Sequence, residues 1–182
     1  VSDAAAVGIV EKVISALFIV PSSMLATVSA LSAQNFGAGK EKRATDTLRY
    51  ATVITTIYGV IVAVLIQFIA ENVVGIFTSD TTVVTMGSAY IRSYIWDCIF
   101  AGIHFSFSGY FAACGKSYIG FLHNIISITF VRVPGSYLAS KYFTDTLYPM
   151  GLAAPAGSLV SVAICVTAFI LLKRKSRVAQ TV

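Results

Sequence analysis

Three side chains that can exchange protons or hold a cation lie on one face of a predicted helix in the middle of the chain. Asp97, His104 and Ser108 follow one another at spacings of seven and four residues, which bring side chains to the same side of an α-helix. Since Ile, Phe and Tyr surround them, we expect this polar stripe to face the protein interior or a cavity. A carboxylate, an imidazole and a hydroxyl in a row can relay protons or bind a cation such as Na⁺. We therefore predict an ion-coupling site at these residues.

Asp97 is the most informative of the three, because it is the sole acidic residue between Asp80 and Asp145 and lies within an apolar run. That run is longer than the roughly 20 residues that an α-helix needs to cross a bilayer. A carboxylate in the middle of such a span costs about 2.5 kcal/mol or more on insertion scales, so it needs a cavity, an ion or a partner. Two interpretations remain: an ion-binding residue, or a structural carboxylate paired with Arg92 or His104.

The composition places these residues in a membrane protein. Of the 182 residues, 57% are hydrophobic and only 12% are charged, whereas soluble domains have about 25% charged residues. The net charge of +5 does not indicate nucleic-acid binding, because the basic residues lie at the ends of apolar runs. The three cysteines lie in or beside apolar runs, so we interpret them as packing residues and predict neither a disulfide set nor a metal site.

Five apolar segments can each cross the hydrocarbon core as an α-helix, so the fold class that we predict is an all-α, polytopic membrane helix bundle. The segments cover residues 4–33, 50–70, 86–113, 118–140 and 151–172. They form one transmembrane region over residues 1–173, followed by a cytoplasmic tail at 174–182. The linkers are short, so consecutive helices should be antiparallel neighbours.

Charged residues at the helix ends predict an orientation in the membrane. Basic residues flank the first connection, the third connection and the end of the last helix, at Lys40, Lys42, Arg43, Arg49, Lys116, Lys173, Arg174, Lys175 and Arg177. Cytoplasmic ends carry an excess of Lys and Arg, so these ends should face the cytoplasm. Asp80, Asp145 and the N-terminus then lie outside. An outward N-terminus without a basic region before it leads us to expect further helices upstream.

Two stripes of small residues indicate close helix packing, since small side chains let helix backbones approach one another in lipid. The first comprises Ala153, Gly157, Ser161 and Cys165, and the second comprises Ser29, Ala33 and Gly37. Glycine also permits backbone conformations closed to other residues. We therefore expect Gly37→Leu to disrupt folding more than Lys40→Ala does.

Arg132 lies 16 residues after Lys116, or roughly 24 Å along a helix, so we expect it near the outer interface with its guanidinium snorkelling towards water. Pro134 should kink or loosen the helix there, and Pro21 should do the same in the first helix. Further buried polar candidates are Gln67, Asn124 and Ser127.

Three motifs resemble those of multidrug and toxic compound extrusion (MATE) transporters. The sequence AQNFGAGK at 33–40 resembles the loop after the eighth helix of that family, with Gln34, Asn35, Gly37 and Gly39 as its characteristic residues. The sequence IFTSD at 76–80 resembles the segment before the tenth helix, and Arg132-Val133-Pro134 resembles the RxP element of the eleventh. The resemblance implies helices eight to twelve, which are part of one six-helix lobe of a two-lobed antiporter.

The same resemblance implies a function. MATE transporters export organic, often cationic, compounds in exchange for Na⁺ or H⁺ by alternating access, and they need no cofactor. Asp97 resembles the tenth-helix carboxylate that NorM-type members use in cation coupling. The implied partners are the lipid of a cell membrane, a small organic substrate, and the N-terminal lobe and seventh helix of the same protein.

Two other functions remain open. A lipid-linked sugar flippase of a related two-lobed family should carry more cations in its central cavity than this sequence offers. A non-transport membrane enzyme or subunit is the third interpretation, but an enzyme needs a paired catalytic set, and Asp97 and His104 lie on the same helix. No GxxxxGK[ST], HExxH, GxSxG or CxxC pattern occurs. We therefore predict that the chain is not an enzyme.

Overall fold

A computed structural model describes the backbone of residues 2–180 and the side chains of residues 3–175. Within this range every regular element is helical and no strand occurs, which confirms the predicted all-α bundle. The elements are α1 (Ser2–Leu17), α2 (Ile19–Gly37), α3 (Glu41–Gly75), α4 (Thr81–Tyr94), α5 (Asp97–Ala113), α6 (Ser117–Ser127), the π-helical turn η1 (Ile128–Arg132), α7 (Val133–Tyr142), α8 (Tyr148–Gly151) and α9 (Ala153–Gln180).

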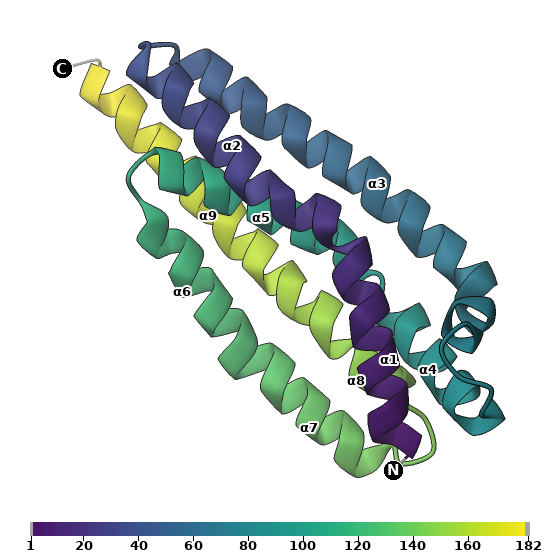
Figure 1. Ribbon diagram of the computed structural model, residues 1–182. Helices are drawn as coiled ribbons and strands as arrows, with labels where there is room; N and C mark the ends of the chain where they lie inside the picture. Colours follow the sequence, from purple (N-terminus) through teal and green to yellow (C-terminus); the bar gives the residue numbers. More distant parts are fainter. Residues whose placement is uncertain (1, 181–182) are drawn as a thin grey trace.

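Helix α5 occupies the centre of the bundle and begins at Asp97. It packs against α2, α3, α6 and α9. Figure 1 shows α2 and α3 running side by side on one side of α5, with α6 and α7 on the other. Because neighbours surround α5, most of its side chains are buried, including those of Asp97, His104 and Ser106.

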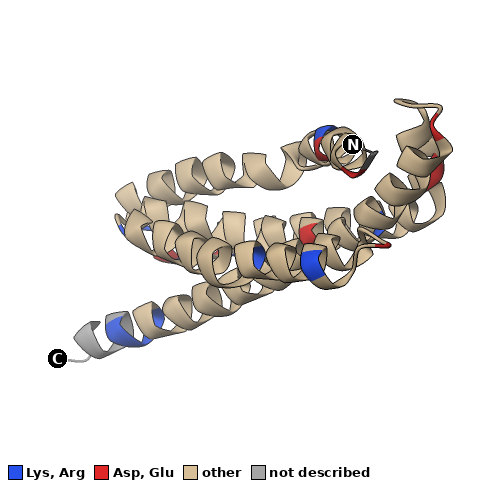
Figure 2. Ribbon diagram, turned by 90° about the horizontal axis from the view of Figure 1, so that it is seen from below, with Lys and Arg blue, Asp and Glu red and all other residues tan. Residues whose placement is uncertain are grey.

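The outer surface of the bundle is apolar, as lipid requires. Exposed side chains on α3 include Ile54, Ile57 and Phe68, and Figure 2 shows uncharged residues over most of each helix. The helices over Glu41–Gly75 and Tyr148–Lys175 are each long and apolar enough to cross a membrane, and the bent pair α1–α2 counts as a third if it forms one span. The chain is therefore a multi-pass membrane protein.

The helices differ from the predicted segments in their continuity. The segment predicted at 4–33 bends by about 40° between α1 and α2, and the segment predicted at 86–113 is interrupted between Tyr94 and Asp97. Helix α3 begins at Glu41 instead of residue 50. Hydropathy marks the lipid-facing part of a helix, so it misses the charged residues of the first turns, although Glu, Lys and Arg are good helix formers. Helix α9 continues to Gln180, so the segment predicted as a tail at 174–182 extends the last helix as far as the described residues reach.

Pro21 explains the bend between α1 and α2. Proline has no N–H to donate to the carbonyl four residues earlier, which here belongs to Leu17. The hydroxyl of Tyr58 on α3 donates to that carbonyl at 2.9 Å. The backbone acceptor that Pro21 leaves free is thus satisfied inside the bundle, as a membrane protein requires.

Pro134 has a milder effect than a sharp kink. It cannot donate to the carbonyl of Phe130, and the π-helical turn Ile128–Arg132 ends two residues before it. Figure 1 shows that α6 and α7 nonetheless run in nearly one line. A π-helical turn changes the direction in which side chains leave the helix, and Arg132 is its last residue.

The two predicted stripes of small residues differ in burial. Ala153, Gly157, Ser161 and Cys165 are all buried, as predicted. Of the second stripe, Ser29 lies at a close helix contact, because a Cβ at Gly109 would be 3.1 Å from its backbone nitrogen. Ala33 and Gly37 are exposed, so the prediction was wrong for these two; α2 buries Pro21, Val28 and Ser32. A Cβ added to Gly37 would meet nothing within 4 Å, so the expected sensitivity of this position has no steric basis. Gly39 has φ +69° and is the position in this loop that favours glycine.

Candidate functional site

Asp97 is buried at the centre of the bundle and forms an ion pair with Arg132. Only 1% of the Asp97 side chain is exposed, and Arg132 Nη2 lies 3.1 Å from its Oδ2. The same nitrogen lies 3.4 Å from Oδ1. The pair joins the first turn of α5 to the π-helical turn between α6 and α7.

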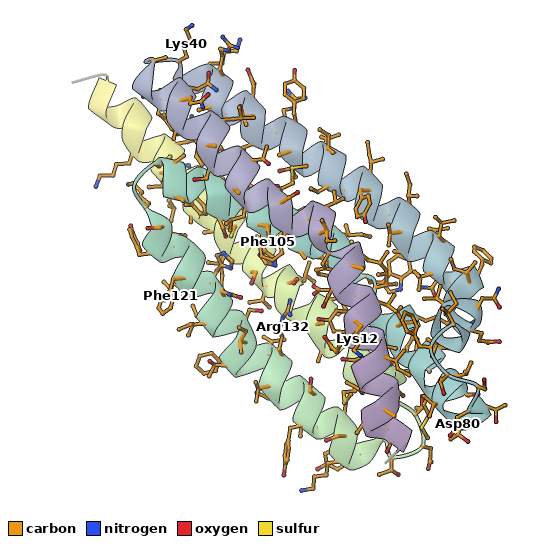
Figure 3. All side chains as sticks on the ribbon, in the orientation of Figure 1. Lys12, Lys40, Asp80, Phe105, Phe121 and Arg132 are labelled. Atoms are coloured by element: carbon orange, nitrogen blue, oxygen red, sulfur yellow. The ribbon has the colours of Figure 1, made fainter. Side chains whose placement is uncertain are left out.

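The expected partners of Asp97 were wrong. Arg92 pairs with Glu71 at 3.2 Å, where 65% of the Glu71 side chain is exposed. His104 contacts Ser158 instead. Arg132 was expected to snorkel outwards, yet its guanidinium points into the bundle, between the α6–α7 helix and α9 (Figure 3). Counting residues along a helix predicts the depth of a side chain but not the direction in which it leaves the helix.

Helix α9 completes the site through two neighbouring residues. Ser158 Oγ accepts a hydrogen bond from Arg132 Nη2 at 2.6 Å and lies 3.4 Å from His104 Nε2. Gly157 provides the space for the Arg132 side chain, because a Cβ at this position would lie 2.5 Å from Arg132 Cγ. The sequence pattern indicated only helix packing for Gly157 and gave no indication of the contacts of Ser158.

His104 and Ser108 lie further along α5 and contact a second histidine. The Ser108 hydroxyl donates to the His104 carbonyl at 2.9 Å, and its Oγ lies 2.8 Å from His123 Nε2 on α6. The rings of His104 and His123 meet edge to face, with 5.4 Å between their centroids. The predicted stripe therefore faces α6 and α9, and His123, Arg132 and Ser158 complete a polar cluster that sequence analysis found only in part.

A cavity of about 290 Å³ lies beside this cluster, between α2, α5 and α6. His104, Ser108 and His123 form a polar part of its wall, while Phe105 and Phe121 contribute aromatic surface. Asp97 and Arg132 are not among the residues that line it. The cavity thus combines hydrogen-bonding side chains with aromatic surface.

Of the other polar candidates, Ser127 lies beside the cluster, since a Cβ at Gly157 would meet its Oγ at 2.8 Å. Asn124 is exposed, so its predicted burial was wrong. Gln67 is half-buried and donates to the backbone carbonyl of Arg92 at 3.0 Å. Ser127 is buried, and its hydroxyl has no hydrogen-bond partner among the described residues. Within the same part of the chain, no group of three or more His, Cys, Asp or Glu side chains could hold a metal ion.

Comparisons with known proteins identify relatives of this chain. The family model described as MatE matches residues 2–138, which include Asp97, His123 and Arg132. Protein DETOXIFICATION 14 of Arabidopsis thaliana is 29% identical over 147 residues. That match covers 80% of this chain but 30% of the relative, so the chain spans less than a third of that protein's length. No solved structure matches.

Proposed function

Because the chain belongs to the MatE family, we propose that it is part of a secondary active efflux transporter that exports small organic compounds in exchange for Na⁺ or H⁺ by alternating access. The proposal concerns a complete protein with a second lobe, since the chain corresponds to 30% of its curated relative. Membership in a transporter family agrees with the prediction that the chain is not an enzyme. A cell membrane, plasma or inner, is the proposed location.

Asp97 is the residue that we propose to bind the driving cation. The single observation that carries this proposal is a carboxylate with 1% exposure at the centre of a membrane bundle. Ionisable residues at such positions are costly and commonly mark ion pathways. His104 and Ser108 extend from Asp97 along the same face of α5 towards the cavity, which supports their proposed part in coupling.

A flippase is less well supported. The cavity beside α5 has no Lys or Arg among its lining residues, and Arg132 is neutralised by Asp97. While Arg132 is paired with Asp97, an anionic lipid-linked sugar would find no free cation among these groups, whereas an organic cation would meet no repulsive charge.

The proposal is tested by Asp97→Asn, with Glu71→Gln as its matched control, in a full-length transporter that contains this segment. Each substitution replaces an acid by its amide and removes one ion pair, but the Glu71 pair is exposed. We expect Asp97→Asn to lose export driven by an imposed Na⁺ or H⁺ gradient. Glu71→Gln should stay within about twofold of the parent, because exposed ion pairs contribute about 0–1 kcal/mol.

Folding must be measured beside transport, by yield and by thermal unfolding of the purified protein. A purely structural Asp97 predicts loss of folded protein instead, because Arg132 would remain without its partner. Full gradient-driven export by well-folded Asp97→Asn protein would refute the proposal, and the coupling carboxylate would then lie in another part of the transporter.

A further inference from the structure

We propose that Arg132 is a built-in competitor of the driving cation: its guanidinium neutralises Asp97 in the arrangement described here and leaves the carboxylate when Na⁺ or H⁺ binds. This inference rests on the proposed role of Asp97 in coupling. It assigns to Arg132 a positioning role, because its release would transmit the arrival of the cation to the helices that carry it.

The geometry of the pair favours exchange. One nitrogen, Nη2, contacts both Asp97 oxygens, at 3.1 and 3.4 Å. That nitrogen is shared with Ser158, and Arg132 Nε is buried without a partner among the described residues. Arg–carboxylate pairs that use two parallel N–H···O bonds are the stronger and more specific ones. A pair held through one shared nitrogen is therefore easier for another cation to replace.

The Arg132 side chain can move towards the surface of the bundle, whereas the Asp97 side chain is enclosed. The Arg132 side chain is 30% exposed and the Asp97 side chain 1% exposed. Arg132 ends a π-helical turn just before Pro134, where the regular α-helical hydrogen bonds are already interrupted. A local rearrangement of this turn can withdraw the guanidinium from α5 while the carboxylate remains buried.

The exchange keeps the buried carboxylate neutralised throughout. One positive charge leaves Asp97 as another arrives, so no step leaves an isolated carboxylate in the bundle, which would be very costly. Arg132 links α5, through Asp97, to α9, through Ser158 and Gly157. Its release therefore loosens the contact of the α6–α7 helix with both α5 and α9, which is how cation binding can promote a change in helix packing.

The test uses Arg132→Gln in the full-length transporter, reconstituted in proteoliposomes. The measured quantity is the half-saturating concentration of the driving cation, determined for Na⁺ and for H⁺ separately. Because the competitor is removed, we expect this concentration to fall about fivefold or more, within the range of typical coupling between sites. A residue that served folding alone would change the amount of active protein without changing this concentration.

Gly157→Ala provides a variant with unchanged charge. Its methyl group would displace the Arg132 side chain, so the half-saturating concentration should fall in the same direction. Gly8→Ala is the control, because a Cβ there would meet nothing within 4 Å, and it should leave the concentration unchanged.

An unchanged or higher half-saturating concentration in folded Arg132→Gln protein would overturn the inference. If that variant does not accumulate in folded form, Gly157→Ala decides by the same criterion. Failure of this inference differs from failure of the proposed function: export lost in Asp97→Asn together with an unchanged half-saturating concentration in the Arg132 and Gly157 variants rejects the competitor role alone. Retained cation dependence in Asp97→Asn rejects the coupling role of Asp97 itself.

Discussion

Glycine residues determine how closely the helices around Asp97 approach one another. A Cβ at Gly102 would lie 2.5 Å from Thr55 Cβ, and a Cβ at Gly59 would lie 2.8 Å from Ile99 Cα. A Cβ at Gly109 would overlap the backbone carbonyl of Leu25 on α2. Lipid gives little hydrophobic driving force for helix association, so these close approaches help to hold α5 between α2 and α3.

Gly109→Ala should therefore destabilise the protein. The added methyl group would meet the backbone of α2, which cannot move aside as a flexible side chain can, and overpacking of this kind costs about 1–3 kcal/mol. The measurement is the thermal unfolding midpoint of purified protein. Gly8→Ala is again the matched control and should be neutral or stabilising, since alanine is the better helix former. Equal midpoints for the two variants would contradict the steric account.

At the residue scale, the sequence singled out the acid that is buried but not the residue that it contacts. Asp97 stood out because an acid is rare and costly in an apolar run. Its partnership with Arg132 depends on how the α6–α7 helix packs on α5, which no local pattern encodes. Ser158 and His123 carried no signal as single polar residues on apolar helices. The neighbouring Gly157 indicated close helix packing but no polar contact of Ser158.

At the scale of elements, interruptions in helices place the polar groups. The bend at Pro21 would leave the Leu17 carbonyl without its helical donor, and the Tyr58 hydroxyl on α3 supplies one. The turn before Pro134 directs Arg132 towards Asp97. Each interruption thus lies beside a side-chain contact with another helix.

Tyr58→Phe should lower stability by about 1 kcal/mol, because the Leu17 carbonyl would lose its partner inside the bundle. Thermal unfolding of the purified protein measures the loss. Tyr50→Phe on the exposed face of the same helix is the control and should cost little, since Tyr50 is 67% exposed.

A double-mutant cycle sharpens this test. In a Pro21→Ala background the alanine N–H can donate to Leu17, so Tyr58→Phe should then cost less than it does in the parent. The same loss in both backgrounds would show that the hydroxyl does not compensate for the proline.

Hydropathy located the apolar segments but not all of their breaks. The prolines at 21 and 134 predicted two interruptions, and both occur. The break between Tyr94 and Asp97 contains Ile95 and Trp96 and neither Gly nor Pro, so it left no signal in the sequence. Ile95 in this break is fully buried in the cluster that joins α1, α3 and α4.

At the scale of the whole molecule, charge separates the two ends of the bundle. Lys40 lies at the end of the bundle where α9 finishes, and Asp80 lies at the opposite end (Figure 3). Figure 2 shows Lys and Arg near the C-terminal end of α9, before the grey segment. Which end faces the cytoplasm follows from the excess of basic residues and stays a prediction.

Cysteine labelling tests this orientation. Cys98, Cys114 and Cys165 are first replaced, and single cysteines are then introduced at the exposed positions Asp145 and Lys40. In intact cells a membrane-impermeant reagent should label the residue-145 cysteine, and it should reach the residue-40 cysteine only after permeabilisation. Labelling of the residue-145 cysteine from the cytoplasmic side alone would contradict the predicted orientation and indicate the opposite one.

The central claim is that the driving cation binds at Asp97, and direct cation binding to purified full-length transporter tests it most directly. Tracer Na⁺ measures sodium binding, and proton release on substrate addition measures the coupled proton. We expect Asp97→Asn protein of normal thermal stability to bind fewer Na⁺, or to release fewer protons, than the parent and the Glu71→Gln control. Equal binding or release by all three proteins would contradict the account.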